Sequence, residues 1–333
     1  MRTPVTYARA YVARRVAGSV SCAVEELAMD ELGEGDVTVE ITWSGANYKD
    51  ALATRADGKV ARLDRLVPGV DLAGTVVESA SDDFDAGDSV LAHGYGLGVS
   101  HNGGFATHAR LPAEWLVPLP EGLTAREAMV VGTAGFTAAL CLGRLEKAGV
   151  VPGDKPVLVT GATGGVGSFA VAMLARRGFE VVASTGKVEA GSWLRELGAA
   201  TIVDRAELAA PARPLEAQRF GGAIDSVGGS TLAHVLSAVA WGGAVAACGS
   251  TGGSALSTTV FPFILRGVSL LGVDSTATPM GVRRETWGRI ASELGPTELE
   301  RIVAGEVGLG ALAPVLDELL AGAVRGRVLV RPG

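Results

Sequence analysis

Thr160-Gly-Ala-Thr-Gly-Gly-Val-Gly-Ser168 is the stretch of sequence that decides the fold. An apolar run over residues 155–161 predicts a buried strand, and residues 166–177 have the pattern of a helix beneath a sheet. A second strand is expected at residues 180–185. Strand, glycine-rich turn, helix and strand form the context that a GxGxxG dinucleotide motif requires. We therefore expect a dinucleotide to bind here, although a purely structural glycine turn has the same local sequence.

The glycine loop itself supplies candidate contacts to that dinucleotide. On the GxGxxG spacing, Ala162, Gly164 and Gly167 take the three key positions, with alanine in place of the first glycine. Glycine has no Cβ to keep a pyrophosphate away from the backbone, and the helix N-terminus offers free N–H groups to the phosphates. The expected cofactor-binding residues of the loop are Ala162, Thr163, Gly164, Gly165, Val166 and Gly167.

The end of the second predicted strand indicates which dinucleotide binds. An NAD-binding site places a carboxylate there to accept the ribose hydroxyls, and that carboxylate repels a 2′-phosphate. This chain instead has Ser184, Thr185, Gly186 and Lys187, which offer hydroxyl groups and a cation. Glu189 follows closely and weakens the argument. The pattern favours NADPH as the cofactor, against the alternative that Lys187 is an ordinary solvated lysine.

Strands and helices alternate through the middle of the chain. Further helices are expected at residues 188–197 and 231–240, and further strands at 200–203, 223–227, 243–248 and 268–273. This alternation is typical of an α/β fold with a doubly wound parallel (Rossmann) sheet. We place that domain at residues 123–275.

The rest of the chain has a different texture. Short strands at residues 37–43, 71–77 and 88–92, without helices between them, predict a compact β-barrel. Helices are expected at residues 283–293 and 312–321. The final strand, residues 327–330, is too short to stand alone and should return to the barrel. The second domain is therefore discontinuous and comprises residues 1–122 and 276–333.

Composition excludes several classes of function. The chain has 333 residues and a formal net charge of −7, which argues against nucleic acid as a partner. The stretch 226–265 has no charged residue, but glycines and Pro262 divide it too finely for a membrane span. Three widely separated cysteines favour a reducing, cytoplasmic location. Four arginines precede Glu25; an exposed hairpin face explains them better than a transit peptide.

Several blocks of sequence resemble one protein family. They are Asn47-Tyr-Lys-Asp-Ala-Leu52, Pro68-Gly-Val-Asp-Leu-Ala-Gly74, Gly132-Thr-Ala-Gly-Phe-Thr137, Gly161-Ala-Thr-Gly-Gly-Val-Gly167 and Pro262-Phe-Ile-Leu-Arg266. In this order they resemble the zinc-free medium-chain dehydrogenase/reductases, and within them the acrylyl-CoA reductase and quinone-oxidoreductase-like branch. The resemblance extends from about residue 36 to residue 331, and it implies that the discontinuous barrel domain is GroES-like.

The resemblance also bears on metal binding. Zinc-dependent relatives hold the metal with a cysteine early in the barrel and a histidine in a Gly-His-Glu turn. Here the two regions read Trp43-Ser-Gly-Ala-Asn-Tyr48 and Gly69-Val-Asp71, and no histidine pairs with a cysteine or carboxylate at ligand spacing. We therefore expect no metal.

Without a metal to polarise an alcohol, hydride delivery to an electron-poor double bond is the easier reaction. A conjugated thioester or ketone can hold the developing charge on its oxygen. Asn47 and Tyr48 match the family motif at this place, so we expect the amide to orient the ring or substrate and the phenol to donate a hydrogen bond or proton. A buried tyrosine satisfying a backbone group is the alternative. Lys49 and Asp50 are interpreted as a structural ion pair.

Other cofactor contacts are expected outside the glycine loop. Thr133 suits the nicotinamide region, Arg205 the adenosine end and Arg327 the phosphates, and Ser250 follows a strand whose carboxyl end faces the ligand crevice. Ile264 and Ser275 lie in blocks similar to cofactor-contacting stretches of the family. A structural role is an equally strong reading for Arg205, Ser250, Ile264, Ser275 and Arg327.

Three functional hypotheses remain open on the sequence. The first is an NADPH-dependent reductase of an enoyl thioester such as acrylyl-CoA; the second is an NADPH quinone reductase; the third is a non-catalytic NADPH-binding protein. Retention of both Asn47 and Tyr48 favours an enzyme. The candidate cations for coenzyme A phosphates are Arg62, Arg65, Arg283, Arg284 and Arg289, and His101 is a candidate substrate contact.

The chain is also expected to form a homodimer. Residues 268–273 are almost entirely apolar and form the last strand of the doubly wound sheet, at or near its edge. An exposed apolar edge strand needs a cover, and a second copy related by a two-fold axis provides one.

Overall fold

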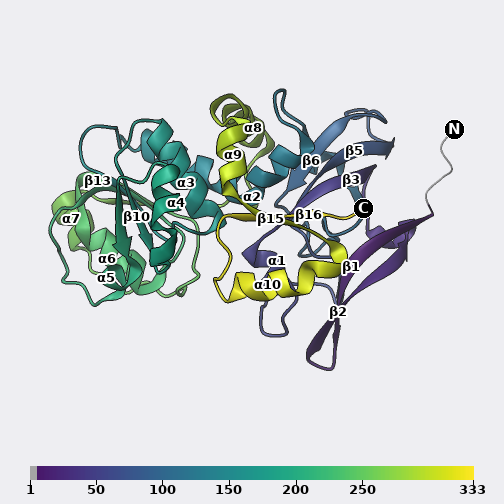
Figure 1. Cartoon of the computed structure of the whole chain (residues 1–333), viewed down its shortest axis with the longest axis horizontal. Helices are drawn as coiled ribbons and strands as arrows, with labels where there is room; N and C mark the ends of the chain where they lie inside the picture. Colours follow the sequence, from purple (N-terminus) through teal and green to yellow (C-terminus); the bar gives the residue numbers. More distant parts are fainter. Residues whose placement is uncertain (1–5) are drawn as a thin grey trace. The chain divides into compact units, whose positions relative to one another are not determined.

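The computed structural model describes residues 6–333, which form two compact units. The first unit holds the chain up to Thr133 and again from Thr276 onward, and the second unit holds Ala134–Ser275. In Figure 1 the residues of the second unit run from teal to green along the sequence.

The second unit is built on a six-stranded sheet in which every neighbouring pair of strands is parallel. The strand order is β11-β10-β9-β12-β13-β14, the doubly wound order that the alternating sequence predicts. The strands are β9 (Val157–Val159), β10 (Val181–Thr185), β11 (Thr201–Asp204), β12 (Phe220–Asp225), β13 (Val239–Ala247) and β14 (Ser269–Gly272). The helical segments are α3 (Gly165–Arg176), η3 (Val188–Ala190), α4 (Gly191–Glu196), α5 (Arg205–Ala209), α6 (Gly229–Ala238) and α7 (Phe261–Arg266).

The first unit is mainly β-structure. A seven-stranded sheet has the order β15-β16-β3-β5-β6-β8, with β7 paired to β3, and a smaller sheet has the order β2-β1-β4. The strands are β1 (Tyr7–Val16), β2 (Ser19–Ala28), β3 (Val37–Ala46), β4 (Arg65–Leu66), β5 (Asp71–Ser79), β6 (Ser89–His93), β7 (His108–Leu111), β8 (Val117–Pro118), β15 (Val303–Gly308) and β16 (Arg327–Arg331). The helical segments are η1 (Met29–Leu32), α1 (Tyr48–Ala53), η2 (Ala113–Trp115), α8 (Met280–Glu293), α9 (Pro296–Ile302), η4 (Leu309–Ala311) and α10 (Leu312–Leu320).

The hairpin expected near the N-terminus is present. Strands β1 and β2 pair over their full length around Ala17 and Gly18, which both have positive φ, as a tight two-residue turn requires. Arg14 forms an ion pair with Glu25 across the hairpin. Arg2 lies outside the described residues.

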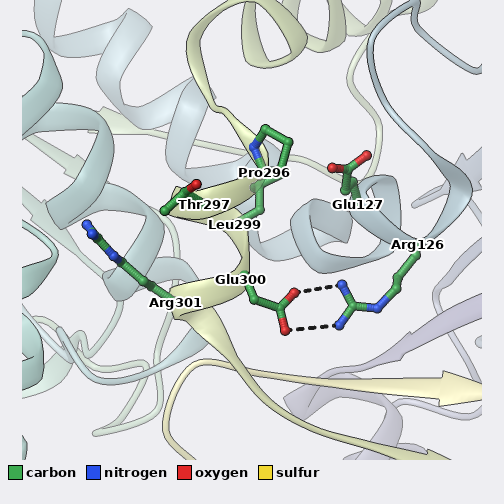
Figure 2. Close-up of a pocket in the computed structure, with 7 residues that line it drawn as sticks. All are labelled: Arg126, Glu127, Pro296, Thr297, Leu299, Glu300 and Arg301. Carbon is green, nitrogen blue, oxygen red and sulfur yellow. Dashed lines mark hydrogen bonds and ion pairs between the residues drawn. The ribbon is translucent and has the colours of Figure 1, made fainter.

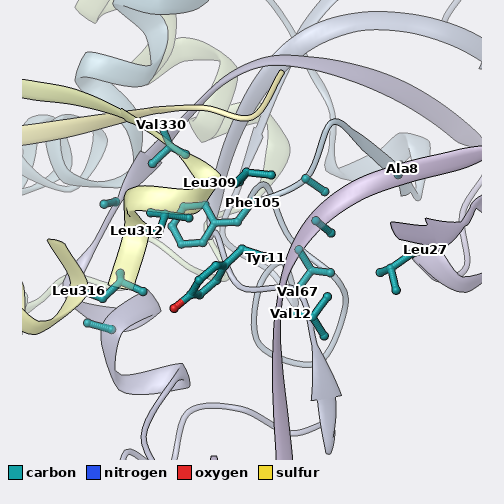
Figure 3. Packing of buried hydrophobic residues seen from close by; sticks show 14 of the residues in the cluster. Ala8, Tyr11, Val12, Leu27, Val67, Phe105, Leu309, Leu312, Leu316 and Val330 are labelled. Atoms are coloured by element: carbon teal, nitrogen blue, oxygen red, sulfur yellow. The ribbon is translucent and has the colours of Figure 1, made fainter. Parts of the chain in front are cut away.

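The last strand, β16, lies in the sheet of the first unit, between β15 and β3. β16 pairs antiparallel with β3, as expected for a strand too short to stand alone. Figure 3 shows the core beneath it, where Val330, Leu312 and Leu316 pack with Tyr11 and Phe105 from much earlier in the chain. Burial of this apolar surface holds the C-terminal segment to the barrel.

Helix α2 (Ala125–Lys147) is long and apolar enough to cross a membrane by length and composition. However, 78% of its apolar stretch is buried inside the protein, as in the core helix of a folded unit. The helix breaks at Gly132, whose φ of 47° and ψ of −156° are not helical. The sequence patterns did not predict the α9–β15 segment.

Candidate active site

The glycine loop connects β9 to α3 in the second unit, where the sequence placed it. Gly161 has a φ of 60°, and a Cβ on Gly167 would lie 2.3 Å from the carbonyl oxygen of Gly161. Gly167 therefore lets the start of α3 pack against the loop. A Cβ on Gly164 would meet only the oxygen of Gly161, at 3.3 Å. The backbone at Gly164 is consequently approachable, and α3 begins at Gly165 with its N–H groups available for an anion.

The loop lies where the strand order of the sheet reverses, between β9 and β12. Thr160 at the end of β9 donates a hydrogen bond of 2.7 Å to the Asp225 carboxylate at the end of β12. Asp225 also accepts the N–H of Gly228 at 2.7 Å, and burial raises its pKa. Open α/β sheets bind their ligands at this switch point.

Cations lie at the end of β10, although the carboxylates of Glu189 and Asp204 nearby are also exposed. The Arg205 guanidinium lies against Gly186, because a Cβ on Gly186 would be 2.5 Å from its Nε. The nearby Asp204 carboxylate turns away to cap α5, accepting the N–H of Ala206 at 2.8 Å. The backbone N–H of Lys187 donates to Thr185 Oγ1. Gly186, Lys187 and Arg205 thus form the accessible part of the predicted phosphate site.

The two hydroxyl residues of this segment differ from the expectation. Ser184 and Thr185 are buried, with 1% and 3% of their surface exposed. Thr185 Oγ1 accepts from Lys187 and lies 3.3 Å from the hydroxyl of Thr163. Thr185 therefore shapes the loop from inside instead of facing a phosphate. Three other predicted contacts stay predictions: Ser250 is exposed, Ser275 is half-buried, and Ile264 is 68% exposed on α7.

Helix α1 of the first unit carries the predicted catalytic pair at its N-terminus. Tyr48 is the first residue of the helix and is 38% exposed, and its hydroxyl has no hydrogen-bond partner among residues 6–333. This placement differs from the alternative of a buried tyrosine that satisfies a backbone group. Asn47 precedes the helix, and its backbone N–H donates to Asp50 Oδ2 at 2.8 Å.

Asp71 is the centre of a buried polar network beneath Asn47. It has no exposed surface. One carboxylate oxygen accepts both the N–H and the hydroxyl of Thr133, at 2.9 and 2.5 Å. The other accepts Asn47 Nδ2 at 2.8 Å and Arg327 Nη2 at 2.9 Å. Asp71 is not recognisable as a site residue from the sequence, because no local pattern joins it to Asn47 or Arg327.

Arg327 requires a correction. The sequence assigned it to cofactor phosphates, but its side chain is 2% exposed and forms a buried ion pair with Asp71. All five of its N–H donors are used. They donate to the carbonyl oxygens of Val130, Ala46 and Met129, to the amide oxygen of Asn47 and to Asp71.

The prediction for Asn47 also changes. Its two amide hydrogens donate to the Gly45 carbonyl at 3.1 Å and to Asp71, and its amide oxygen accepts from Arg327 at 2.8 Å. No donor of the amide is left to orient a ring or a substrate. Asn47 connects the buried network to α1 instead.

The same network shows whether the residues at this place could bind a zinc ion. The position of the zinc-binding turn holds Asp71, but its carboxylate is already paired with a guanidinium, and Asn47 and Tyr48 stand where relatives have the cysteine region. Zinc sites use thiolate, imidazole and free carboxylate ligands. The donor set of this chain does not fit zinc, and we derive no step through a metal.

Asp50 is a second buried carboxylate next to the first. Burial and the negative charge of Asp71 raise the pKa of Asp50 to about 7, against the backbone N–H groups that stabilise its charge. Those N–H groups belong to Asn47, Gly69 and Val70. Asp50 is not paired with Lys49, as the sequence suggested, because Lys49 Nζ instead donates to Thr276 Oγ1 at 3.2 Å.

The candidate cations for the coenzyme A phosphates differ in how exposed their side chains are. Arg283 is fully buried, lies over the Tyr95 ring at 4.5 Å and donates to the His93 carbonyl, so it cannot bind a phosphate. Burial lowers the pKa of His93, which accepts a hydrogen bond from Trp287.

The other candidate cations are at or near the surface. Arg65 pairs with Glu31 and Arg289 with Glu293. Arg62 and Arg284 are exposed, and neither has an ion-pair partner among residues 6–333.

Two further features lie outside the candidate site. Both ring nitrogens of His101 bond carbonyl oxygens, those of Asn102 and Glu34, so the ring has no nitrogen left for a substrate. A pocket of about 610 Å³ opens beside α9 and the start of α2. Figure 2 shows that the Arg126–Glu300 ion pair borders it, and it contains none of the predicted site residues.

Comparison with known proteins places this geometry in a family. A family model described as alcohol dehydrogenase GroES-like domain matches residues 33–121, and one described as zinc-binding dehydrogenase matches residues 165–292. The chain is 47% identical to a putative quinone oxidoreductase, YhfP, of Bacillus subtilis, over 98% of this chain and 99% of the relative. It is also 47% identical to a probable acrylyl-CoA reductase, AcuI, of Escherichia coli, over 94% and 96% respectively.

Solved structures agree with this assignment. The yhdH oxidoreductase of Salmonella enterica in complex with NADP superposes with a TM-score of 0.95 at 46% identity, covering 98% of this chain and all of that one. The Bacillus subtilis yhfP structure, with NAD bound, also gives 0.95 at 47% identity, over 98% of this chain and all of that one. The chain belongs to the medium-chain dehydrogenase/reductase family of oxidoreductases. Within that family it falls in the acrylyl-CoA reductase and quinone oxidoreductase branch, as the sequence blocks indicated.

Proposed function

We propose that this chain reduces the carbon–carbon double bond of a short enoyl thioester with NADPH, acrylyl-CoA to propionyl-CoA being the type reaction. One observation carries the proposal: the exposed Tyr48 phenol has no hydrogen-bond partner within the described part of the chain and lies at the start of a helix that a buried network holds in place. Relatives named acrylyl-CoA reductase support it, as does the NADP complex of the Salmonella enterica structure.

The second unit serves as the NADPH-binding domain and the first as the substrate domain. The backbone around Gly164 and the N-terminus of α3 bind the pyrophosphate. Lys187 and Arg205 bind the 2′-phosphate. NADPH, when bound, supplies the hydride. Because Thr133 donates its hydroxyl hydrogen to Asp71, its oxygen can only accept from a ligand, which suits the amide N–H group of a nicotinamide.

Tyr48 acts on the substrate. Hydride addition to the distal carbon of an enoyl thioester moves negative charge onto the thioester oxygen, forming an enolate. The Tyr48 hydroxyl donates a hydrogen bond to that oxygen, which stabilises the charge as it develops. A proton then adds to the carbon next to the thioester, and the double bond is fully reduced. Arg62 and Arg284 are the cations available for coenzyme A phosphates.

Quinone reduction is the second candidate, because the Bacillus subtilis relative at 47% identity bears that name. In that reaction the hydride goes to the quinone, and Tyr48 matters mainly through packing. The two candidates differ in where isotopes appear, which makes the test direct.

The deciding experiment follows deuterium. NADPH deuterated at nicotinamide C4 should place its label on the distal carbon of the saturated thioester. Turnover in D2O should label the carbon next to the thioester. Acrylyl-CoA, crotonyl-CoA and a benzoquinone are compared side by side. Turnover of the benzoquinone together with no reaction of any enoyl thioester would reject the proposal in favour of quinone reduction.

The chain further acts as a cytoplasmic homodimer. Strand β14 lies at the edge of the six-stranded sheet. Exposed apolar side chains gather on and next to it, on α7 and the strand itself; they are Val260, Phe261, Ile264, Leu265 and Leu270. A second copy pairing at this edge would cover them and continue the sheet.

A further inference from the structure

The buried ion pair between Asp71 and Arg327 has contacts that stabilisation of a barrel core alone does not explain. Replacing a buried pair with apolar side chains is often neutral or stabilising, so such a pair is weak evidence for a stabilising role alone. Here the pair binds two separate segments of the candidate site at once. One is Gly45–Tyr48, at the end of β3 and the start of α1, and the other is Met129–Thr133, at the break in α2.

The chain makes room for this pair with two glycines. A Cβ on Gly132 would lie 2.3 Å from the Asp71 carboxylate, and a Cβ on Gly45 would lie 2.5 Å from Arg327 Nη2. Contacts this short do not occur with real side chains, so any other residue at either position would displace the pair. The two glycines therefore leave the space that the Asp71 carboxylate and the Arg327 guanidinium occupy.

Each half of the pair has a distinct task. The guanidinium uses four of its five donors to bind carbonyl oxygens of both segments and the Asn47 amide oxygen. The carboxylate accepts from Asn47 and from both donors of Thr133. Lysine could not replace the arginine fully, because an ammonium group has three donors and no planar fork.

We propose that the Asp71–Arg327 pair is the positioning element of the active site, which fixes Tyr48 through Asn47 and fixes Thr133 directly, in the place that a metal centre takes in zinc-dependent relatives. Both residues are buried, with 2% of the Arg327 side chain and none of the Asp71 side chain exposed. The inference rests on the proposed roles of Tyr48 and Thr133, and it adds the residues that hold them.

A double-mutant cycle tests the coupling to Tyr48. Asp71→Asn keeps the size of the side chain but removes its charge. The kcat for the enoyl thioester should fall about 10–100-fold, while the KM and the Kd for NADPH change less than about threefold. In a Tyr48→Phe background, Asp71→Asn should cause a smaller fold-loss than in the native enzyme, because one of the two residues that it positions is already disabled. Losses that multiply would overturn the inference.

Arg327→Lys is a second variant, which allows the inference to be tested even if Asp71→Asn fails to fold. It retains the positive charge beside Asp71, so the buried carboxylate keeps a partner. We expect an intermediate kcat, between the native enzyme and Asp71→Asn, and the same non-additivity with Tyr48→Phe. Arg14→Met is the matched control, since it removes an arginine–carboxylate pair of the same unit that lies on the outer hairpin. Its kcat should equal that of the native enzyme.

Hydrogen–deuterium exchange separates this inference from the proposed reaction. In Asp71→Asn, amide exchange should accelerate about tenfold or more in peptides covering residues 45–50 and 129–133. Peptides covering the glycine loop, residues 161–168, should exchange at the native rate. If the native enzyme reduces only quinones, the proposed function fails while this readout still decides the positioning role. Native exchange rates in both segments would reject it.

Discussion

At the scale of the residue, Tyr48 is the group on which the proposed chemistry depends. Tyr48→Phe removes one hydroxyl and almost no volume, and the exposed phenol has no partner among residues 6–333 to leave unsatisfied. The kcat for an enoyl thioester should fall roughly 10–1000-fold if the hydroxyl acts mainly in the transition state. Stopped-flow and steady-state assays measure this, with NADPH Kd as the control. Native turnover by the variant would remove Tyr48 from the mechanism.

Lys187 and Arg205 should determine the preference between the two dinucleotides. Each cation removed should weaken NADPH by ~1–2 kcal/mol, because a charge-assisted contact to the 2′-phosphate is lost. Binding of NADH should hardly change. Fluorescence titration of both cofactors against Lys187→Ala and Arg205→Ala measures the difference. Arg213→Ala, which removes an exposed arginine paired with Glu216 elsewhere in the same unit, is the control. Equal losses for NADH and NADPH would contradict the phosphate assignment.

Titration of Asp50 should make the folded protein less stable as the pH rises. Its pKa is about 7 in the folded chain and near 3.9 when unfolded. Between these values the folded chain holds a proton that the unfolded chain has lost. The free energy of unfolding therefore falls as pH rises from about 4 to 7, by up to about 4 kcal/mol, and levels off above pH 7.

Asp50→Asn removes this titration and isolates it from the other carboxylates. Urea unfolding of both proteins from pH 4.5 to 7.5 gives the difference in free energy. The variant should gain stability relative to the native chain as pH rises through that window. Parallel curves would show that Asp50 titrates alike in both states.

The extent to which sequence predicted the site depends on how far apart its parts lie in the chain. The glycine loop and its flanking strand and helix are contiguous, so periodicity and glycine spacing sufficed to find them. Asn47, Asp71 and Arg327 are linked across 24, 256 and 280 residues. No local pattern shows such partners. A lone arginine near the last strand therefore suggested phosphate binding, and the Asn47 amide suggested a ligand contact.

At the scale of the element, the break in α2 depends on Gly132. Its backbone conformation is accessible to almost no other residue, and strain of this kind costs about 1–3 kcal/mol. Gly132→Ala adds a clash with the Asp71 carboxylate to that strain. It should destabilise the chain and lower kcat, as measured by urea unfolding and steady-state assays.

Gly149→Ala is the control for this prediction. Gly149 also has positive φ, at 86°, but a Cβ there meets nothing within 4 Å. The control therefore reports the backbone strain without the clash. Equal destabilisation by the two substitutions would show that the buried pair accommodates a methyl group.

Helices and strands were predicted well where apolar residues are continuous. They were predicted poorly where contacts with distant segments determine the local structure. The inner strands β9, β10 and β12 of the parallel sheet are almost wholly buried and are recognisable as apolar runs. Residues 303–308 alternate between half-buried and exposed and contain two glycines, which makes β15 a weak strand signal.

At the scale of the whole molecule, the predicted homodimer makes the edge strand β14 an interface. Leu270→Lys places a charge on that strand, where its side chain is partly exposed. Light scattering at micromolar concentration should show a dimer for the native chain and a monomer for the variant. Val16→Lys, at an exposed position on the β1–β2 hairpin, should remain dimeric. A monomeric native chain would refute the assembly.

The separation between Asn47 and Arg327 has a consequence for the synthesis of the protein. A ribosome releases the Asn47 and Asp71 segments long before it reaches the arginine, 280 residues after Asn47. At about 5–20 residues per second, that interval lasts roughly 14 to 56 s. During it the Asp71 carboxylate lacks the cation with which it is buried in the folded chain. A newly made chain therefore acquires this network only after β16 has been synthesised, and a product cut before β16 carries the glycine loop without the arginine that holds Asn47 and Asp71.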